Sequence, residues 1–157
     1  MRKRPQAIGK AARYEYGGRT EQTKAAFKRR ADARALAEKE RWRGAMYLGG
    51  YAVECRLKAK LMEMFNARTL DHLGKILTRR TGQKVELATH SIEYLFGFTG
   101  ARNRLSSHGN ERVLKAYRCC NTWTTSWRYR PDDGKSDECE QFLDAVDLFD
   151  RFIESSI

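Results

Sequence analysis

Four polar and aromatic side chains lie on one face of a predicted helix. Tyr47, Tyr51, Glu54 and Lys58 follow one another at spacings of four, three and four residues, and residues three or four apart are neighbours on a helix surface. The tyrosines could stack on nucleobases beside the charged pair. Alternatively, this 47–58 face is an ordinary surface ion pair, worth about 0.2–0.5 kcal/mol, beside two tyrosines that pack.

The 47–58 face is part of a longer motif. The string from Ala45 to Ala59, AMYLGGYAVECRLKA, resembles the central helix of the HEPN family, a group of helical domains found in prokaryotic toxin–antitoxin and defence systems. In that family an alanine and an aromatic residue lead to an Ala-Val-Glu core and then to Leu-Lys-Ala.

Three later segments resemble the same family in the same order. Residues 89–92, Thr-His-Ser-Ile, are similar to the family's Thr-His-Asp-Leu, with a serine in place of the aspartate. Residues 127–129 resemble the Arg-Tyr that precedes the last helix, and residues 137–152 resemble that helix. The resemblance covers about residues 24 to 155.

The resemblance implies a helical bundle that commonly forms dimers and needs no metal or other cofactor. Some members bind nucleotides or RNA, some are metal-independent ribonucleases, and many pair with a nucleotidyltransferase. The nucleases carry an arginine, usually followed by a polar residue, and then a histidine after four to six intervening residues. Arg102, Asn103 and His108 match this pattern. There the histidine could move the proton of a ribose 2′-hydroxyl while the arginine holds the phosphate.

A second arginine centre competes with the first. In the nuclease members the Arg–His motif directly precedes the last helix, and in this chain that place is taken by Arg128 and Tyr129, which no histidine follows. We expect Arg128 and Tyr129 to lie opposite the 47–58 face and to bind a ligand. His90 is a further candidate, whose simpler interpretation is a histidine at a helix start that bonds to neighbouring backbone.

A helical frame is predicted to position these residues. The 125 residues between Pro5 and Pro131 contain no proline, which favours helices. No segment alternates with period two, so we predict an all-α fold, a HEPN-like bundle of four or five helices over residues 21–157, after a basic flexible arm over residues 1–20. Apolar residues at helical spacing predict helices over 21–40, 42–65, 111–123 and 136–154, a short helix over 69–79 and a short amphipathic turn over 91–98, with a polar loop over 97–109.

Two adjacent glycines interrupt the predicted central helix. Gly49 and Gly50 should cost about 1 kcal/mol each in helix propensity. We therefore expect another helix to cross closely at this point.

The charge is unevenly distributed. The net charge of +11 comprises +9 over residues 1–44, +9 over 45–130 and −7 over 131–157. This asymmetry indicates either a polyanionic partner for the basic part or packing of the acidic end on a basic neighbour, and the sequence leaves both open.

Composition excludes several classes of protein. With 41% hydrophobic and 32% charged residues, the chain is globular rather than disordered. It lacks the run of about 20 apolar residues that spans a membrane, and we expect a cytoplasmic location. The four cysteines, at 55, 119, 120 and 139, form no Cys-x-x-Cys pair, which favours buried thiols over a metal site.

Three classes of function remain. The preferred expectation is a HEPN-type subunit of a prokaryotic defence or toxin–antitoxin system. We expect it to form a homodimer, to bind RNA or a nucleotide, and to act with a partner such as a nucleotidyltransferase or another defence protein. The alternative is a metal-independent endoribonuclease toxin that uses Arg102 and His108. The third is a dimerisation adaptor with incidental charge.

Overall fold

A computed structural model describes residues 17–107 and 109–157. This part of the chain contains seven α-helices, one 3-10 helix and no β-strand, which confirms the predicted all-α class. No helix in it combines the length and apolarity needed to cross a bilayer. In chain order the elements are α2 (Arg19–Glu38), α3 (Trp42–Met64), α4 (Leu70–Thr81), α5 (Ile92–Gly97), α6 (Arg102–Leu105), α7 (Glu111–Cys120), η1 (Thr125–Tyr129) and α8 (Ser136–Ser156). The predicted count of four or five helices was too low, because the short helices α5 and α6 have only six and four residues.

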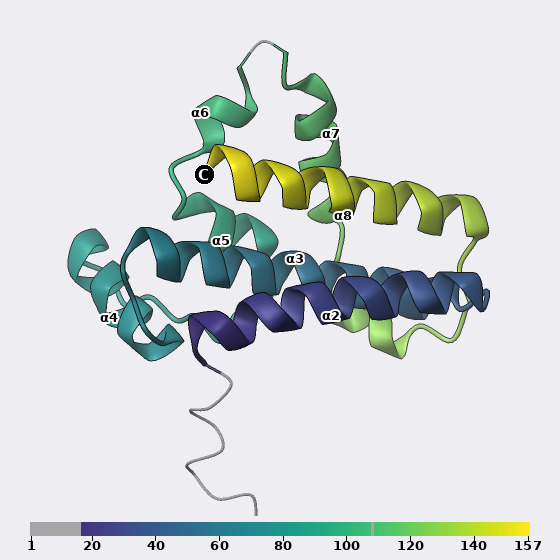
Figure 1. Cartoon of the computed structure of the whole chain (residues 1–157), viewed down its shortest axis with the longest axis horizontal. Coiled ribbons are helices and arrows are strands. Elements are labelled where there is room, and N and C mark those ends of the chain that lie inside the picture. Colours follow the sequence, from purple (N-terminus) through teal and green to yellow (C-terminus); the bar gives the residue numbers. More distant parts are fainter. Residues whose placement is uncertain (1–16, 108) are drawn as a thin grey trace, which may run out of the picture.

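The three long helices form the frame of the molecule. Helices α2 and α3 run antiparallel beside one another, α8 lies along both, and α7 packs on α8 (Figure 1). The turn between α2 and α3 is short, and Glu40 adopts a positive φ of 59° within it. Helix α5 packs on α3, and α4 lies at the end of the bundle.

Helix α3 is the centre of the core, as its apolar pattern predicts. Fourteen of its 23 residues are buried, which requires neighbours on more than one side. The core continues across α5, α7 and α8, where the rings of Phe96, Tyr117 and Phe149 pack with centroids 4.8–5.5 Å apart.

The two glycines of α3 mark close approaches of different kinds. A Cβ atom on Gly49 would lie 2.9 Å from the Leu143 side chain of α8, so the expected helix crossing is confirmed there. A Cβ atom on Gly50 would collide with the indole of Trp123. That residue follows α7 and belongs to no helix, so at Gly50 the close neighbour is a side chain rather than a crossing helix.

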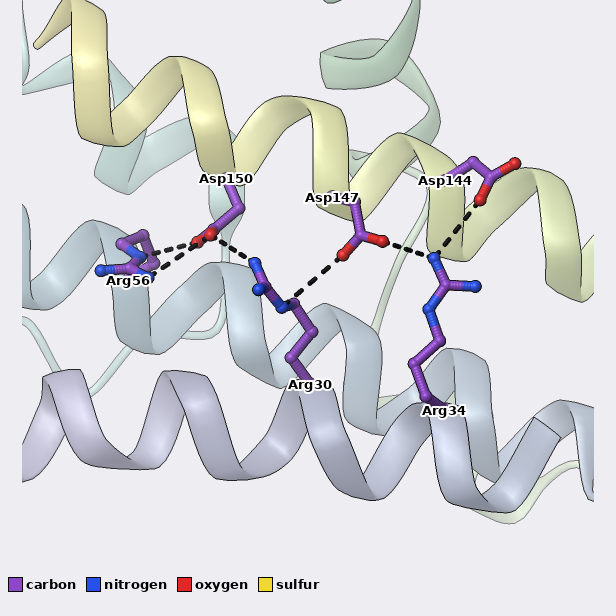
Figure 2. Close-up of polar contacts among 6 residues, drawn as sticks. All are labelled: Arg30, Arg34, Arg56, Asp144, Asp147 and Asp150. Carbon is purple, nitrogen blue, oxygen red and sulfur yellow. Dashed lines mark hydrogen bonds and ion pairs between the residues drawn. The ribbon is translucent and has the colours of Figure 1, made fainter. Parts of the chain in front are cut away.

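Arginines of α2 and α3 pair with the acidic residues of α8. Asp150 accepts from Arg56 Nε at 2.6 Å and from Arg30 Nη1 at 2.7 Å, and both Arg56 and Asp150 are buried. One turn earlier, Asp147 accepts from Arg34. The acidic end of the chain therefore does pack on a basic neighbour. Figure 2 shows this α8 charge network, which comprises Arg30, Arg34, Arg56, Asp144, Asp147 and Asp150.

Several helix boundaries differ from the predicted ones. Helix α2 already begins at Arg19, within the segment expected to be a flexible arm; the arm's residues 1–16 lie outside the described residues. Helix α6 occupies part of the expected polar loop, because the buried Leu105 anchors one helical turn to the core. Helix α7 stops at Cys120 rather than Trp123, since Trp123 turns back to pack on α3.

All four cysteines are free thiols. Cys120 and Cys139 are buried as expected, whereas Cys55 and Cys119 are half-buried. Burial raises the pKa of the Cys55 thiol to about 11 and also raises the pKa of Cys120. Both groups are therefore protonated, weak nucleophiles near neutral pH.

Candidate functional site

The charged pair of the 47–58 face is buried rather than exposed. Only 4% of Glu54 and 6% of Lys58 is accessible to solvent, and Lys58 Nζ lies 2.6 Å from Glu54 Oε1. The interpretation as an ordinary surface ion pair is therefore wrong. Removal of two charges from water is costly, and such a pair persists only where both groups have well-placed partners.

The second oxygen of Glu54 holds a histidine from another segment. His90 Nδ1 lies 2.9 Å from Glu54 Oε2, so this histidine bonds to a buried carboxylate rather than to neighbouring backbone, as its simpler interpretation proposed. The His90 side chain is still 49% exposed, and no described residue bonds to its other ring nitrogen, Nε2. Glu54 thus fixes the ring while one nitrogen faces outward.

Three aromatic rings form a connected group beside this histidine. The Tyr51 ring packs edge-on against His90 at 5.7 Å and against Trp123 at 5.0 Å, and Tyr47 packs edge-on against Tyr51 at 5.1 Å. Trp123 Nε1 donates a hydrogen bond to the Tyr47 carbonyl oxygen at 3.0 Å, which ties the segment after α7 to α3. We call Tyr47, Tyr51, Glu54, Lys58, His90 and Trp123 the Glu54 cluster.

The surroundings of Tyr51 favour its neutral form. Burial, the hydrogen bond from Tyr47 and the charge of Glu54 together raise the pKa of Tyr51 to about 12, although the positive charge of Arg128 opposes them. Tyr51 is therefore a neutral hydroxyl over the physiological range. It packs and hydrogen-bonds in this cluster and does not act as a base.

A groove of about 290 Å³ opens beside His90. One wall is the start of α5, and the other is the segment that joins α7 to η1. Most of the lining side chains are hydroxyls, amides or charged groups, namely His90, Ser91, Glu93, Asn121, Thr124 and Thr125, with Ile92 and Trp123 as the apolar members. We call this the His90 groove.

The predicted catalytic arginine lies at the edge of this groove. Arg102 and Asn103 are exposed on α6, and Arg102 Nη2 lies 3.5 Å from Glu93 Oε1, a carboxylate that lines the His90 groove. His108 lies outside the described residues, so the geometry of an Arg102–His108 pair is not defined here. What the structure does bring together is Arg102, Glu93 and the groove.

The second arginine centre forms an exposed platform. Tyr129 is 76% exposed on η1, and the Arg128 guanidinium lies 5.0 Å from the centre of its ring. Arg128 is also near enough to lower the pKa of Tyr51. It is not a partner of Glu54, because both oxygens of that carboxylate are taken by Lys58 and His90. We call Arg128 and Tyr129 the η1 platform.

Sequence reasoning missed two members of this region. Trp123 packs against Tyr51 and lines the groove. The sign of it in the sequence was Gly50, because the Trp123 indole leaves no room for a Cβ atom at that position. Glu93 joins the groove to Arg102. No pattern in the sequence singles it out, since one exposed glutamate in a short helix resembles any other.

A larger cavity of about 690 Å³ lies between α4 and residues 84–88. Among the predicted site residues only Lys58 lines it. Its rim lysines are already neutralised, because Lys75 pairs with Asp71 at 2.7 Å and Lys84 pairs with Glu86 at 2.6 Å. The lining residues of the His90 groove contact Tyr47, Tyr51, Glu54 and Arg102, so this groove is the better candidate site.

Comparison with known proteins gave no match for this chain to a protein-family model, to a curated protein or to a solved structure.

Proposed function

We propose that this protein is a HEPN-type subunit that binds RNA or a nucleotide and acts with a partner protein in a prokaryotic defence or toxin–antitoxin system. The resemblance of residues 24–155 to that family supports the proposal. The observation that carries it is the η1 platform, an exposed tyrosine beside an arginine at the edge of the Glu54 cluster.

The chemistry of the platform fits a nucleic acid. An exposed aromatic ring can stack on any nucleobase, which is worth about 1–3 kcal/mol per base. The adjacent Arg128 guanidinium can pair with a phosphate. Tyr129 makes few contacts with the bundle, since 76% of it is exposed, and its removal should leave the fold unchanged.

The charge that remains after internal pairing also fits a polyanion. Arg30, Arg34 and Arg56 are engaged with the carboxylates of α8. Lys24 and Lys28 are exposed on α2, and no ion pair joins them to a carboxylate in the described part of the chain. Free cations of this kind bind phosphates with release of counterions.

Binding of a short fluorescent single-stranded RNA, followed by anisotropy, tests the proposal. We expect Tyr129→Ala to weaken binding by about 5–150-fold, the factor that corresponds to loss of one stacked base. Tyr94→Ala is the matched control, because Tyr94 is also exposed but packs on Phe98. Equal affinity of the wild type and Tyr129→Ala would contradict the platform, and absence of binding to both RNA and a nucleotide at low salt would contradict the function.

The same samples examine the other expectations. A metal-independent endoribonuclease that uses Arg102 and His108 would still cleave RNA in the presence of a chelator. RNA recovered after such an incubation should therefore be run on a gel, where cleavage gives shortened products. Sedimentation should give twice the mass of the 18.2 kDa chain if the proposed homodimer forms. Inspection of the neighbouring genes for a nucleotidyltransferase, followed by co-expression and co-purification with it, tests the proposed partner.

A further inference from the structure

We propose that the His90 groove binds a phosphate monoester, the terminal phosphate of a 5′-phosphorylated RNA or of a nucleotide. The proposal rests on the proposed function and adds a specific anchor to it. The η1 platform would hold a base, and the groove would hold the phosphate at the end of the ligand.

The first step of the argument is the fixed orientation of His90. Its Nδ1 atom is held 2.9 Å from Glu54, whose own position is fixed by the buried Lys58. The Tyr51 ring packs on the imidazole from the side. When the ring carries both protons, the Nε2–H is therefore a donor whose direction is set before a ligand arrives, and it belongs to a residue that lines the groove.

The second step is the set of neutral donors around this nitrogen. Ser91 Oγ accepts a hydrogen bond from the Tyr94 backbone N–H, which leaves its hydroxyl hydrogen free to donate. Thr125 adds a second hydroxyl on the opposite wall. A phosphate monoester has three non-bridging oxygens and can take several such donors at once, whereas a phosphodiester has two.

The third step concerns charge at the groove. Glu93 would repel an anion, but it pairs with Arg102 at 3.5 Å with both side chains more than half exposed. Only Nη2 of Arg102 is engaged with Glu93, and a guanidinium carries five N–H donors, so Arg102 can keep Glu93 neutralised and still donate to a phosphate. Lys58 already neutralises Glu54, and Arg102 and Arg128 then supply positive charge.

The size of the groove agrees with a terminal group. Its volume of about 290 Å³ is at the lower end of the roughly 300–1,000 Å³ of small-ligand sites. A phosphate with part of its ribose fits that volume, and the base of the ligand would then extend along the surface.

The test compares two RNAs of identical sequence, one with a 5′-phosphate and one with a 5′-hydroxyl. We expect the wild type to bind the phosphorylated RNA about tenfold more tightly, the factor that one charge-assisted hydrogen bond supplies. His90→Ala should bring the ratio of the two affinities close to one. Thr125→Val is a second variant, needed because His90→Ala removes a partner of the buried Glu54–Lys58 pair. It should reduce the difference in affinity between the two RNAs and leave that pair intact.

Competition with AMP, adenosine and inorganic phosphate separates the two sources of the phosphate. Displacement of the phosphorylated RNA by AMP but not by adenosine supports a nucleotide site, and resistance to AMP supports an RNA end. Equal wild-type affinity for the two RNAs, or a difference retained in both variants, would overturn the proposal while the proposed function stands. If neither RNA binds, RNA is not the ligand of the proposed function, and direct binding of AMP over adenosine then decides the phosphate site; absence of binding to both RNAs and to AMP would contradict the proposed function.

Discussion

Two buried carboxylates, Asp150 and Glu54, hold cations in different ways. Asp150 in the α8 charge network accepts from the buried Arg56 and from Arg30, so three helices are joined at one side chain (Figure 2). Glu54 accepts from the buried Lys58 of its own helix and from His90, which is half exposed at a groove.

The difference lies in what remains available for a ligand. In the α8 charge network the cations that contact Asp150 are held between helices, and their charge is used within the fold. In the Glu54 cluster one cation is buried, while the other donor is the half-exposed ring of His90, a residue that lines the groove. Burial of a charged pair therefore does not by itself indicate a binding site. The feature that does is a partner of the buried carboxylate that stays exposed to solvent, which is His90 in the Glu54 cluster.

The largest effect is expected from Asp150→Ala. This change leaves Arg56 buried without its carboxylate, and loss of one partner of a buried pair costs about 3–5 kcal/mol. Urea unfolding should show this loss in the free energy of unfolding. Asp144→Ala is the control, because Asp144 is exposed and pairs only with Arg34 at 3.3 Å, so that about 0–1 kcal/mol is expected. A similar loss in both variants would contradict the distinction between buried and exposed pairs.

Gly50→Ala should have the next largest effect. Its methyl group would collide with the Trp123 indole, and overpacking of this kind costs about 1–3 kcal/mol. Because Trp123 also lines the His90 groove, the loss of stability should be accompanied by weaker RNA binding.

Gly44→Ala is the matched glycine variant for that experiment. A Cβ atom there would lie 3.4 Å from the end of the Leu36 side chain, and the gain in helix propensity is about 1 kcal/mol. We expect a small stabilisation and unchanged binding. If Gly44→Ala and Gly50→Ala both destabilise the protein, α3 tolerates no added volume at either glycine. The effect at Gly50 would then not be specific to its contact with Trp123.

A smaller effect is expected at high pH from Tyr51. The pKa of Tyr51 is raised from 10.0 to about 12 in the folded protein, so the unfolded chain ionises first. The stabilisation is complete below pH 10 and is lost as the pH rises to about 12. Absorbance titrations of the wild type and of Tyr51→Phe should be subtracted, so that the difference reports the Tyr51 phenol alone. Its midpoint should lie at a pH of about 12 in buffer and of about 10 in concentrated urea. A midpoint near 10 in both solvents would contradict the packing of Tyr51 in the Glu54 cluster.

The smallest effect concerns the salt dependence of RNA binding. Each phosphate contact to a single strand contributes about 0.7 to the slope of log affinity against log salt. We expect Lys28→Ala, at an exposed lysine of α2, to flatten the slope by about this amount. Arg34→Ala should change it less, because Arg34 is paired with Asp147 and Asp144. The reverse order would show that the α8 charge network contacts RNA.

The helices and the polar face of α3 were predictable because they depend on short-range geometry. The spacing that places Glu54 beside Lys58 is a property of one helix, and the predicted bounds of α3 were correct within one residue. The same holds for the end of α4 at Gly82, where a positive φ of 69° suits a glycine.

Only the tertiary structure decided which of these residues form a site. Glu54 and His90 are 36 positions apart, and Arg56 and Asp150 are 94 apart, so no local spacing indicates either pair. Burial of Glu54 and Lys58 depends on segments that pack over α3, and the sequence of that helix alone is equally compatible with an exposed ion pair. The sequence by itself thus determined the helical frame and the 47–58 face, whereas packing between distant segments determined that His90 would be oriented by Glu54 and left half exposed at a groove.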